Sequence, residues 1–386
     1  MYHVSLITSL LDAITEHEYR QLVDACTDST VYNDWPWLHT CAEHLSEEQQ
    51  FLAVLVRDDQ SRLLGFVAFG VTKERLHGIP LRVARFVQYP LGDRVAILLH
   101  PKHLCAWEPL LVFLNERPES HWDCMIWNEW TETQGLLHRA EQWAKKNQTP
   151  FFHRVTSLCP ILALEYSTEE EMISGYPSKM RTDLRRRKKK LNALSSEVFH
   201  LRPSTAETPG LIENIRKTEA ASWKGREGVG IFNAPVTYAF FKDLSQCLAA
   251  YDQLDLSIVN IDGELASYKY GFYFRNTFYD YSIGYLPQYS KLGLGRILLD
   301  ELTLSALTKG YKAVDASRVG ATTQHLLLER TKVTIPHHRA YWFGNSLKSK
   351  LLMILVIHGK PRMNLARKKY RKWIESRKAI QRKAEK

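Results

Sequence analysis

The stretch that decides the fold is residues 277–317, TFYDYSIGYLPQYSKLGLGRILLDELTLSALTKGYKAVDAS. An aromatic strand over 277–285 runs into a short glycine-bearing loop, and an amphipathic helix and a further strand over 311–317 follow. Such a loop opens the helix with unpaired backbone N–H groups, and the helix dipole behind them favours an anion. We therefore predict that the loop holds a phosphate or pyrophosphate through Ser290, Lys291, Leu292, Gly293, Leu294, Gly295 and Arg296.

The spacing of this loop excludes two common phosphate-binding motifs. No Gly-Lys-Ser/Thr follows it, and Leu298 stands where GxGxxG would need its third glycine. A bare Gly-x-Gly loop is also compatible with a simple structural turn. Its context is more informative, because Asp262-Gly263 joins the expected strands 255–260 and 264–275 in a hairpin just before it. The resulting order is three strands, a helix and a strand.

The rest of the chain alternates helical and strand-like apolar patterns, which predicts a mixed α+β protein. In the first half we expect helices over 15–27, 34–45, 106–116 and 132–147, and strands over 51–58, 63–71, 83–89, 95–99, 123–128 and 151–156. In the second half we expect helices over 168–195, 208–222 and 235–251 and a strand over 197–202.

The two halves also share a weak internal similarity. The segments VLVRDDQSRLLGFVAFG (54–70) and SIVNIDGELASYKYGFY (257–273) both read as strand, polar turn and strand, with a glycine near the end. We therefore predict two tandem units, each a mixed, mostly antiparallel sheet flanked by helices. The expected boundaries are 1–165 for a first, degenerate unit, 166–360 for a second unit that carries the site, and 361–386 for a basic tail.

The positive charge of the 386-residue chain is concentrated in two segments. Residues 179–190 carry a net charge of +7 and residues 361–386 carry +9, so the remainder of this +10 protein is mildly acidic. Localised basic segments indicate contacts with phosphate groups or an anionic surface, or simply solvated helix faces. The six cysteines form no CxxC pair, and no secretory signal is recognisable, so we expect a cytoplasmic protein. Through its tail it would touch the inner face of the membrane or RNA.

Four stretches resemble the GNAT N-acyltransferases, and more closely their CelD/BcsL-like branch from exopolysaccharide gene clusters. They are SKMR (178–181) before LRRRKKKL, ASWKGR (221–226) with two glycines after it, GYLPQYS (284–290), and DASRVG (315–320). The resemblance implies a tandem GNAT fold, distantly related to the Fem aminoacyl transferases, and an acyl-CoA such as acetyl-CoA as donor, with no metal.

The chain departs from this family pattern at two places. Ser290 stands where the family's loop usually has Gln or Arg, so Lys291 or Arg296 would have to replace one phosphate contact. Residues 321–325 read ATTQH where the branch usually shows an acidic pair and then Tyr-Lys. The second departure indicates either a different acceptor or reduced activity.

Catalytic candidates lie on the strand over 277–285. In a regular strand Phe278, Asp280 and Ser282 share one face, and Tyr279, Tyr281 and Tyr285 the other. A carboxylate among apolar residues must be paired or functional, so Asp280 is either a general base for the attacking amine or the structural partner of a cation such as Lys269. The resemblance places this strand beside the thioester, with Tyr281 or Tyr285 as the proton donor.

Four further residues are candidates for binding the acceptor: Trp223, Lys224, Arg181 and Arg185. For Trp223 and Lys224, a tryptophan in the core beside a solvated lysine is an equally good explanation. Arg181 and Arg185 share one helical face, which is either a solvated face or a site for an anionic substrate. The pattern His39-x-Cys41-x-x-His44 lacks a fourth zinc ligand and is better explained by packing.

Together these observations favour an acyl-CoA-dependent N-acyltransferase that acts on an amine, such as an amino sugar or a polysaccharide precursor. Direct attack on the thioester would need no covalent enzyme intermediate. Two alternatives remain: a Fem-like aminoacyl transfer from charged tRNA, with the basic segments as RNA contacts, and a non-catalytic scaffold that keeps the fold. Thermal stabilisation by acetyl-CoA, by tRNA or by neither separates the three.

Overall fold

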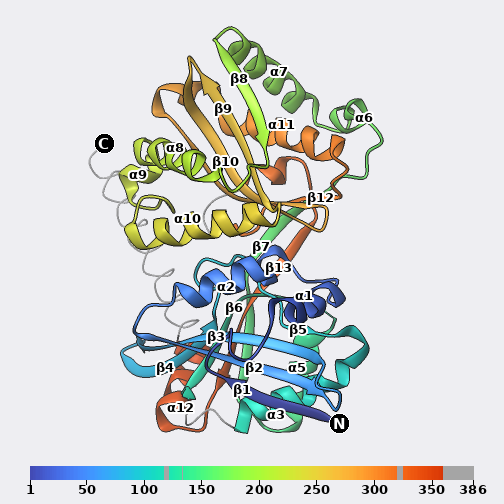
Figure 1. Cartoon of the computed structure of the whole chain (residues 1–386), viewed down its shortest axis with the longest axis vertical. Coiled ribbons are helices and arrows are strands. Elements are labelled where there is room, and N and C mark those ends of the chain that lie inside the picture. The colour runs from blue at the N-terminus through green and yellow to red at the C-terminus, as the bar shows by residue number, and fades with distance from the viewer. Residues whose placement is uncertain (117–120, 133, 320–324, 360–386) are drawn as a thin grey trace, which may run out of the picture.

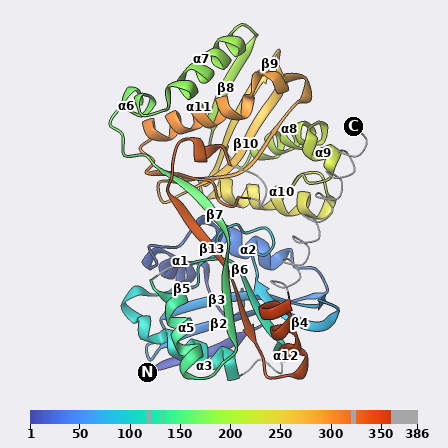
Figure 2. The same cartoon turned by 180° about the vertical axis from the view of Figure 1, so that it is seen from behind.

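The computed structural model describes residues 1–116, 121–132, 134–319 and 325–359. Two units lie one above the other along the long axis of the molecule (Figures 1 and 2). The basic tail 361–386 and the family departure at 321–324 lie outside the described residues, whereas His325 lies within them. No helix in the described ranges is long and apolar enough to cross a membrane.

The first unit is a sheet with helices on both faces. Its strands are β1 (Tyr2–Ile7), β2 (Gln49–Asp58), β3 (Leu63–Leu76), β4 (Ile79–Phe86), β5 (Leu98–Leu99) and β6 (Cys124–Thr131). Its helices are α1 (Glu16–Ala25), α2 (Trp35–Glu43), α3 (Trp107–Glu116) and α5 (Leu136–Lys146). The run over 52–56 is apolar at every position because alternate side chains pack under α1 and α2 or under α3 and α5.

The second unit repeats this plan. Its strands are β8 (Ser196–Leu201), β9 (Leu254–Ile261), β10 (Glu264–Phe274), β11 (Thr277–Tyr285) and β12 (Ala313–Asp315). Its helices are α6 (Glu169–Ser174), α7 (Ser178–Asn192), α8 (Thr208–Ala221), α9 (Trp223–Glu227), α10 (Pro235–Ala250) and α11 (Leu294–Thr308). Helices α7 and α11 lie on one face of the sheet, and α8 and α10 on the other (Figures 1 and 2).

Two long strands cross between the units and join them. β7 (Phe151–Ala163) pairs along its length with β13 (Thr334–Phe343), and β7 also pairs with β12, while β13 also pairs with β6. The strand order of the whole sheet is therefore β1-β2-β3-β4-β6-β13-β7-β12-β11-β10-β9-β8, with β5 attached to β3. In each unit, one strand therefore pairs with a strand from the other half of the chain: β6 of the first unit with β13, and β12 of the second unit with β7.

The order of pairing confirms the expected fold class of tandem, mostly antiparallel units. In the first unit β2, β3 and β4 are antiparallel neighbours and β4 is parallel to β6; in the second, β9, β10 and β11 are antiparallel neighbours and β11 is parallel to β12. The expected hairpin turn is also present, because Asp262 and Gly263 both have positive φ, at 52° and 80°.

We expected the second unit to extend to residue 360, but the segment from β13 onward pairs and packs with the first unit. After β13, the helix α12 (Leu347–Ile354) and the π-helical turn Leu355–Gly359 pack against β4 and β6 of the first unit. Only the tertiary contacts show that the chain returns to the first unit after β13. The sequence of residues 334–359 contains no motif that indicates which unit this segment packs against.

The prediction of a single helix over 168–195 was wrong, because this segment forms two helices, α6 and α7. Helix α6 ends at the cap Gly175, and Pro177 precedes the first residue of α7. A proline disfavours helical backbone in the residue before it, which explains the break. The strand β1, which we did not expect, pairs along the edge of β2.

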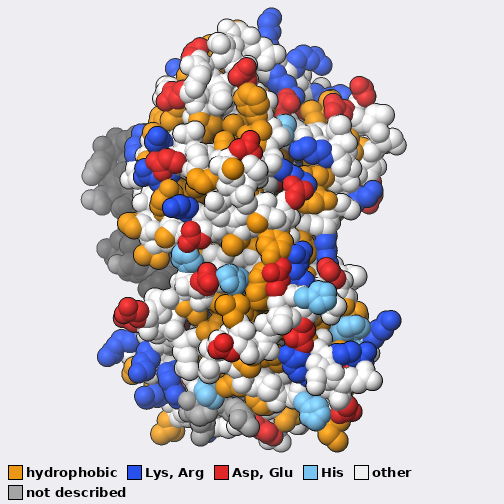
Figure 3. Space-filling view, in the orientation of Figure 1, with side chains coloured by type: hydrophobic (Ala, Val, Ile, Leu, Met, Phe, Trp, Pro, Cys, Tyr) orange, Lys and Arg blue, Asp and Glu red, His pale blue; other side chains and the backbone are white. Residues whose placement is uncertain are grey.

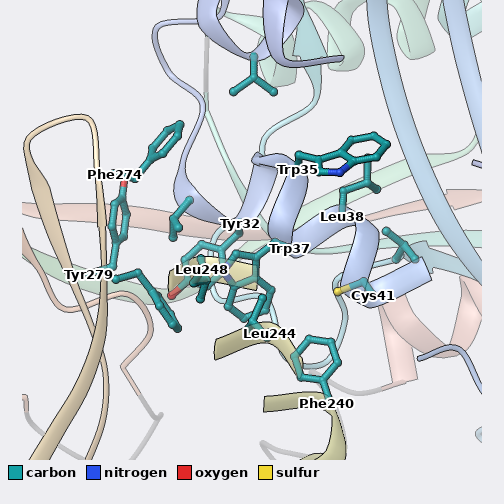
Figure 4. Packing of buried hydrophobic residues seen from close by; sticks show 14 of the residues in the cluster. Tyr32, Trp35, Trp37, Leu38, Cys41, Phe240, Leu244, Leu248, Phe274 and Tyr279 are labelled. Carbon is teal, nitrogen blue, oxygen red and sulfur yellow. The ribbon is translucent and has the colours of Figure 1, made fainter. Parts of the chain in front are cut away.

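One apolar core extends across the boundary between the units. Figure 4 shows Trp37 of the first unit packed against Phe240 and Leu244 of α10, with Tyr32 beside Trp37. The same cluster contains residues of β10 and β11. Because this core is shared, the two units are held as one body, and loops of the first unit are fixed against strands of the second.

Candidate active site

The parallel pairing between β11 and β12 in the second unit is short. β11 pairs with β12 only over 277–279, opposite 313–315, and the same three residues of β12 pair on their other side with β7 before the strand ends. Within the described ranges, β11 has no strand partner on this side beyond Tyr279. We call this edge of residues 280–285 the splay, where backbone groups without a strand partner can meet an extended ligand.

A β-bulge at the splay changes which side chains share a face. Tyr270 lies opposite Ser282 and Gly271 opposite Asp280, so Tyr281 is an extra residue. Ser282 consequently turns away from Asp280 and accepts a hydrogen bond from Lys224 Nζ at 2.7 Å. Tyr285 packs with the start of α11, away from Tyr281. The strict alternation expected for this strand was therefore wrong for Ser282 and Tyr285.

Asp280 lies in a buried ion pair with Lys269, the structural alternative considered from the sequence. His325 Nε2 is 3.4 Å from the same carboxylate. Burial alone would raise the pKa of Asp280, but Lys269 and His325 outweigh it and hold the pKa well below its usual range. A carboxylate that stays ionised in this way is poorly matched to general-base chemistry near neutral pH.

Tyr281 connects the second unit to the first. Its hydroxyl donates a hydrogen bond to the carbonyl oxygen of Leu91 at 2.8 Å. Burial, and next the nearby Asp93, raise its pKa well above the usual value, so the phenol keeps its proton at neutral pH. Tyr281 thus lies beside the splay as a protonated group, whereas Tyr285 lies on the other face of the sheet.

The glycine loop over 290–296 has the expected form. A 3-10 helix over Pro287–Leu292 ends at Gly293, whose φ is +71°, and α11 begins at Leu294. The N–H groups of Leu294 and Gly295 have no intrahelical acceptor at this position. Arg187 of α7 lies over the loop and donates to the carbonyl oxygen of Leu292 at 3.1 Å.

A basic cleft of about 840 Å³ lies beside this loop, between α7 and the start of α11. Its lining includes five cations and two carboxylates: Lys179, Arg186, Arg187, Arg296, Arg330, Asp183 and Glu329. Asp183 pairs with Arg187 at 2.6 Å, and Glu329 with Arg296 at 2.6 Å. The excess of cations and the free N–H groups of α11 suit a phosphorylated ligand.

The four residues predicted to bind the acceptor do not come together. Arg181 and Arg185 line a second cleft of about 670 Å³ on the other side of α7. Trp223, which is 38% exposed, and Lys224 begin α9 on the opposite face of the sheet. Burial lowers the pKa of Lys224. His44 of the unsupported zinc pattern pairs with Asp243 at 2.9 Å.

A cluster of ionisable side chains, buried except for Arg318, lies where the two units meet, and we call it the junction cluster. It comprises Asp93, Arg94, Glu129, Asp315, Arg318 and His337. Arg94 and Asp315 form a buried ion pair, and Arg318 lies 3.4 Å from Asp93 and 3.9 Å from Glu129. The segment after β4 and the segment after β12 are thereby tied together.

His337 links the two halves of the junction cluster. Burial lowers the pKa of this fully buried ring, so it is neutral. Its Nε2 accepts from Arg94 Nε at 3.1 Å, so the ring proton is on Nδ1 and donates to Glu129 Oε2 at 3.2 Å. The tautomer is thus set by its neighbours, and each polar atom of the ring has a partner.

The carboxyl group of Asp93 titrates near neutral pH. Burial raises its pKa to about 7, against the lowering effect of Arg318 and with a further rise from Glu129. The segment that carries Asp93 also holds Leu91, the acceptor for Tyr281 at the splay. Arg318, its ion-pair partner, is 41% exposed, so the cluster borders solvent there.

Sequence reasoning missed most of this cluster. It identified the stretch 315–320 but not Asp93, Arg94, Glu129 or His337. A local signal was available for Glu129, which stands between Trp127 and Trp130 in a strand buried along its length. Asp93 and Arg94 lie in YPLGDR, which reads as an ordinary polar turn.

Residues 178–323 match the family model described as an acetyltransferase (GNAT) domain. The second unit carries a GNAT domain. Its splay, its glycine loop and the helix α11 all fall within the matched residues. No curated protein sequence matches the chain.

Solved structures share the fold of this GNAT domain and of the unit before it. FemX superposes with a TM-score of 0.59 and 11% identity, over 89% of this chain and 98% of FemX. A conserved protein from Bacteroides thetaiotaomicron gives a TM-score of 0.54 and 13% identity, over 86% and 98%. L-PGS from Bacillus licheniformis gives 0.51 and 11%, over 88% and 95%. At these identities the likeness concerns the fold.

Proposed function

We propose that the protein transfers an acyl group from an acyl-CoA, such as acetyl-CoA, to an amine. The observation that carries this proposal is the splay of the GNAT domain together with Asp93, whose pKa is raised to about 7 and which lies two residues from Leu91, the hydrogen-bond acceptor of Tyr281. A base in that range removes a proton efficiently near neutral pH and returns it readily. We therefore assign Asp93, in place of Asp280, as the general base.

The chemistry follows from these positions. Asp93 takes a proton from the acceptor ammonium, and the free amine attacks the thioester carbonyl. The C–N bond forms and the C–S bond breaks, and the thiolate takes the proton of Tyr281, whose oxygen regains the second proton that the attacking nitrogen loses as the amide forms. A backbone N–H of β11 beyond Tyr279 stabilises the oxyanion, because this edge has no strand partner among the described residues.

The donor and the acceptor reach the splay from different sides. The phosphates of the donor lie in the basic cleft beside Gly293 and Arg296. The junction cluster has three carboxylates against two guanidinium groups, a balance that attracts a cationic amine. An amino sugar or polysaccharide precursor, which the CelD/BcsL-like stretches suggest, would provide such an amine.

A second candidate function is aminoacyl transfer from charged tRNA. The basic cleft and the helix α7 favour it, because Lys179, Arg186 and Arg187 on one helix would suit an RNA backbone as well as a nucleotide. The likeness to FemX concerns the fold and leaves the donor open.

Calorimetric titration of the full chain with acetyl-CoA tests the proposal. Gly293→Asp should reduce affinity at least a hundredfold, because a Cβ there would lie 2.0 Å from Arg187 Nη1 and the carboxylate repels phosphate. Gly310→Asp is the matched control, since Gly310 has a φ of +75° and open space around its Cβ, and it should bind normally.

Three results would contradict the proposal. Equal affinity of Gly293→Asp and wild type would remove the loop from the site. Saturable binding of charged tRNA, lost in Gly293→Asp, without binding of acetyl-CoA would support the aminoacyl transfer. Binding of neither would favour a scaffold.

A further inference from the structure

The helix α12 exposes an apolar stripe to solvent. Leu347 is 85% exposed, Leu351 49% and Ile354 52%, and their spacing of four and three residues places them on one side of the helix. The opposite side is packed, because Leu352 and Val356 are buried against β4 and β6. An ordinary surface helix keeps its outer face polar, and no residue of the described ranges covers this stripe.

Two lysines flank the stripe. Lys348 and Lys350 are exposed on α12 itself, whereas Lys73 and Arg75 of β3 lie, by the strand register, on the face of the sheet opposite α12. In the described part of the chain these four side chains form no ion pair, while Glu74 between the last two is held by Arg85 at 2.7 Å. Figure 3 shows Lys and Arg side chains gathered at this end of the first unit, at lower left.

The sequence that follows α12 adds to this charge. The chain runs from Gly359 into residues 361–386, which carry a net charge of +9. A partner for this region must therefore combine an anionic surface with an apolar layer directly beneath it. The interface of an anionic phospholipid bilayer has both properties.

We propose that α12 docks the protein on the surface of an anionic bilayer. Leu347, Leu351 and Ile354 enter the boundary between headgroups and acyl chains, and the lysines beside them contact lipid phosphates. RNA would explain the cations but not the leucines, since a phosphate backbone offers nothing for an apolar stripe to bury. This inference is independent of the proposed acyl transfer.

Flotation of the full chain with vesicles tests the proposal. Wild type should float with vesicles of phosphatidylcholine and phosphatidylglycerol, and much less with phosphatidylcholine alone. The double variant Leu347→Glu/Leu351→Glu should lower the bound fraction at least tenfold. The control Leu11→Glu/Val236→Glu changes two apolar residues that are 62% and 78% exposed on other elements, and it should float like wild type.

Several outcomes would overturn the proposal. Equal flotation of the α12 variant and wild type would show that charge alone binds the vesicle. Absence of wild-type flotation, with binding of a fluorescent RNA that the α12 variant retains, would assign the surface to RNA. Melting temperatures of both variants, expected to equal that of wild type at these exposed positions, show that a loss of flotation is not a loss of fold.

Discussion

The two units share a strand plan but differ at the place where their parallel strands part. In the second unit no described strand pairs with β11 beyond Tyr279 on the side of β12. In the first, the chain leaves β4, crosses to the other unit and returns, so that Val95 pairs with Trp130 and its N–H donates to the carbonyl oxygen of Glu129 at 3.2 Å. The short strand β5 then pairs with β3. The corresponding strand edge of the first unit is thus paired.

This difference separates the roles that we propose for the two units. The core beside this paired edge is rich in tryptophan, with Trp107, Trp127 and Trp130 buried together, so it stabilises the molecule. The crossing segment meanwhile carries Asp93 and Arg94 to the other unit. We infer that the first unit serves the site of the second.

The strongest test of this division of roles is Asp93→Asn, a change in the first unit that should disable the second. We expect kcat to fall by about 10²- to 10⁴-fold with the affinity for acetyl-CoA nearly unchanged, as for loss of a general base. The free energy of unfolding at pH 8 should rise by as much as about 4 kcal/mol, because a buried carboxylate that ionises with a raised pKa weakens the folded state above that pKa. Loss of stability together with activity would make Asp93 structural.

Asp280→Asn should have the opposite effect, although it lies in the second unit. Removing one partner leaves Lys269 buried and unpaired, which should lower the free energy of unfolding by about 3–5 kcal/mol. Denaturant unfolding measures it. The double variant Asp280→Asn/Lys269→Met should recover most of the loss. A stable Asp280→Asn with kcat reduced a hundredfold would return the role of base to Asp280.

The pH dependence of kcat/KM should separate the two carboxylates further. Asp93 is active when ionised, so the rate should fall about tenfold per pH unit below about 7 and level off above it. Asp280 is ionised throughout this range, because its pKa is held low. The pH profile should be measured with two acceptors whose amines differ in pKa. A fall in rate that stays at the same pH with both acceptors belongs to the protein. A fall that shifts with the pKa of the acceptor would contradict the assignment of Asp93.

The smallest effect should come from the two tyrosines of β11. Tyr281→Phe removes the proton donor beside the splay and should lower kcat about tenfold, equivalent to about 1.4 kcal/mol in the barrier. Tyr285→Phe should leave kcat unchanged, because this side chain packs with α11 on the other face of the sheet. Steady-state rates of the two variants suffice. An equal fall in kcat in the two variants would contradict the assignment of Tyr281, and not Tyr285, as the proton donor.

Local features of the site could be predicted from the sequence, whereas its assembly could not. The turn Asp262-Gly263 and the loop at Gly293 are separate features. Each is encoded locally, by one or two residues that tolerate positive φ. The bulge at Tyr281 is set by pairing with Tyr270 and Gly271 on another strand, and it reversed the expected face of Ser282.

Most of the order of strands and helices up to β12, the tandem α+β plan and the glycine loop could be predicted from the sequence, because period, turn chemistry and helix start signals act over short distances along the chain. The proposed base, the junction cluster and the exchange of β7 and β13 depend on the tertiary structure. Arg94 and Asp315 are 221 residues apart, and only the shared core between the units brings them into contact. Burial at that contact also sets the acidity of Asp93, which its neighbours in sequence do not reveal.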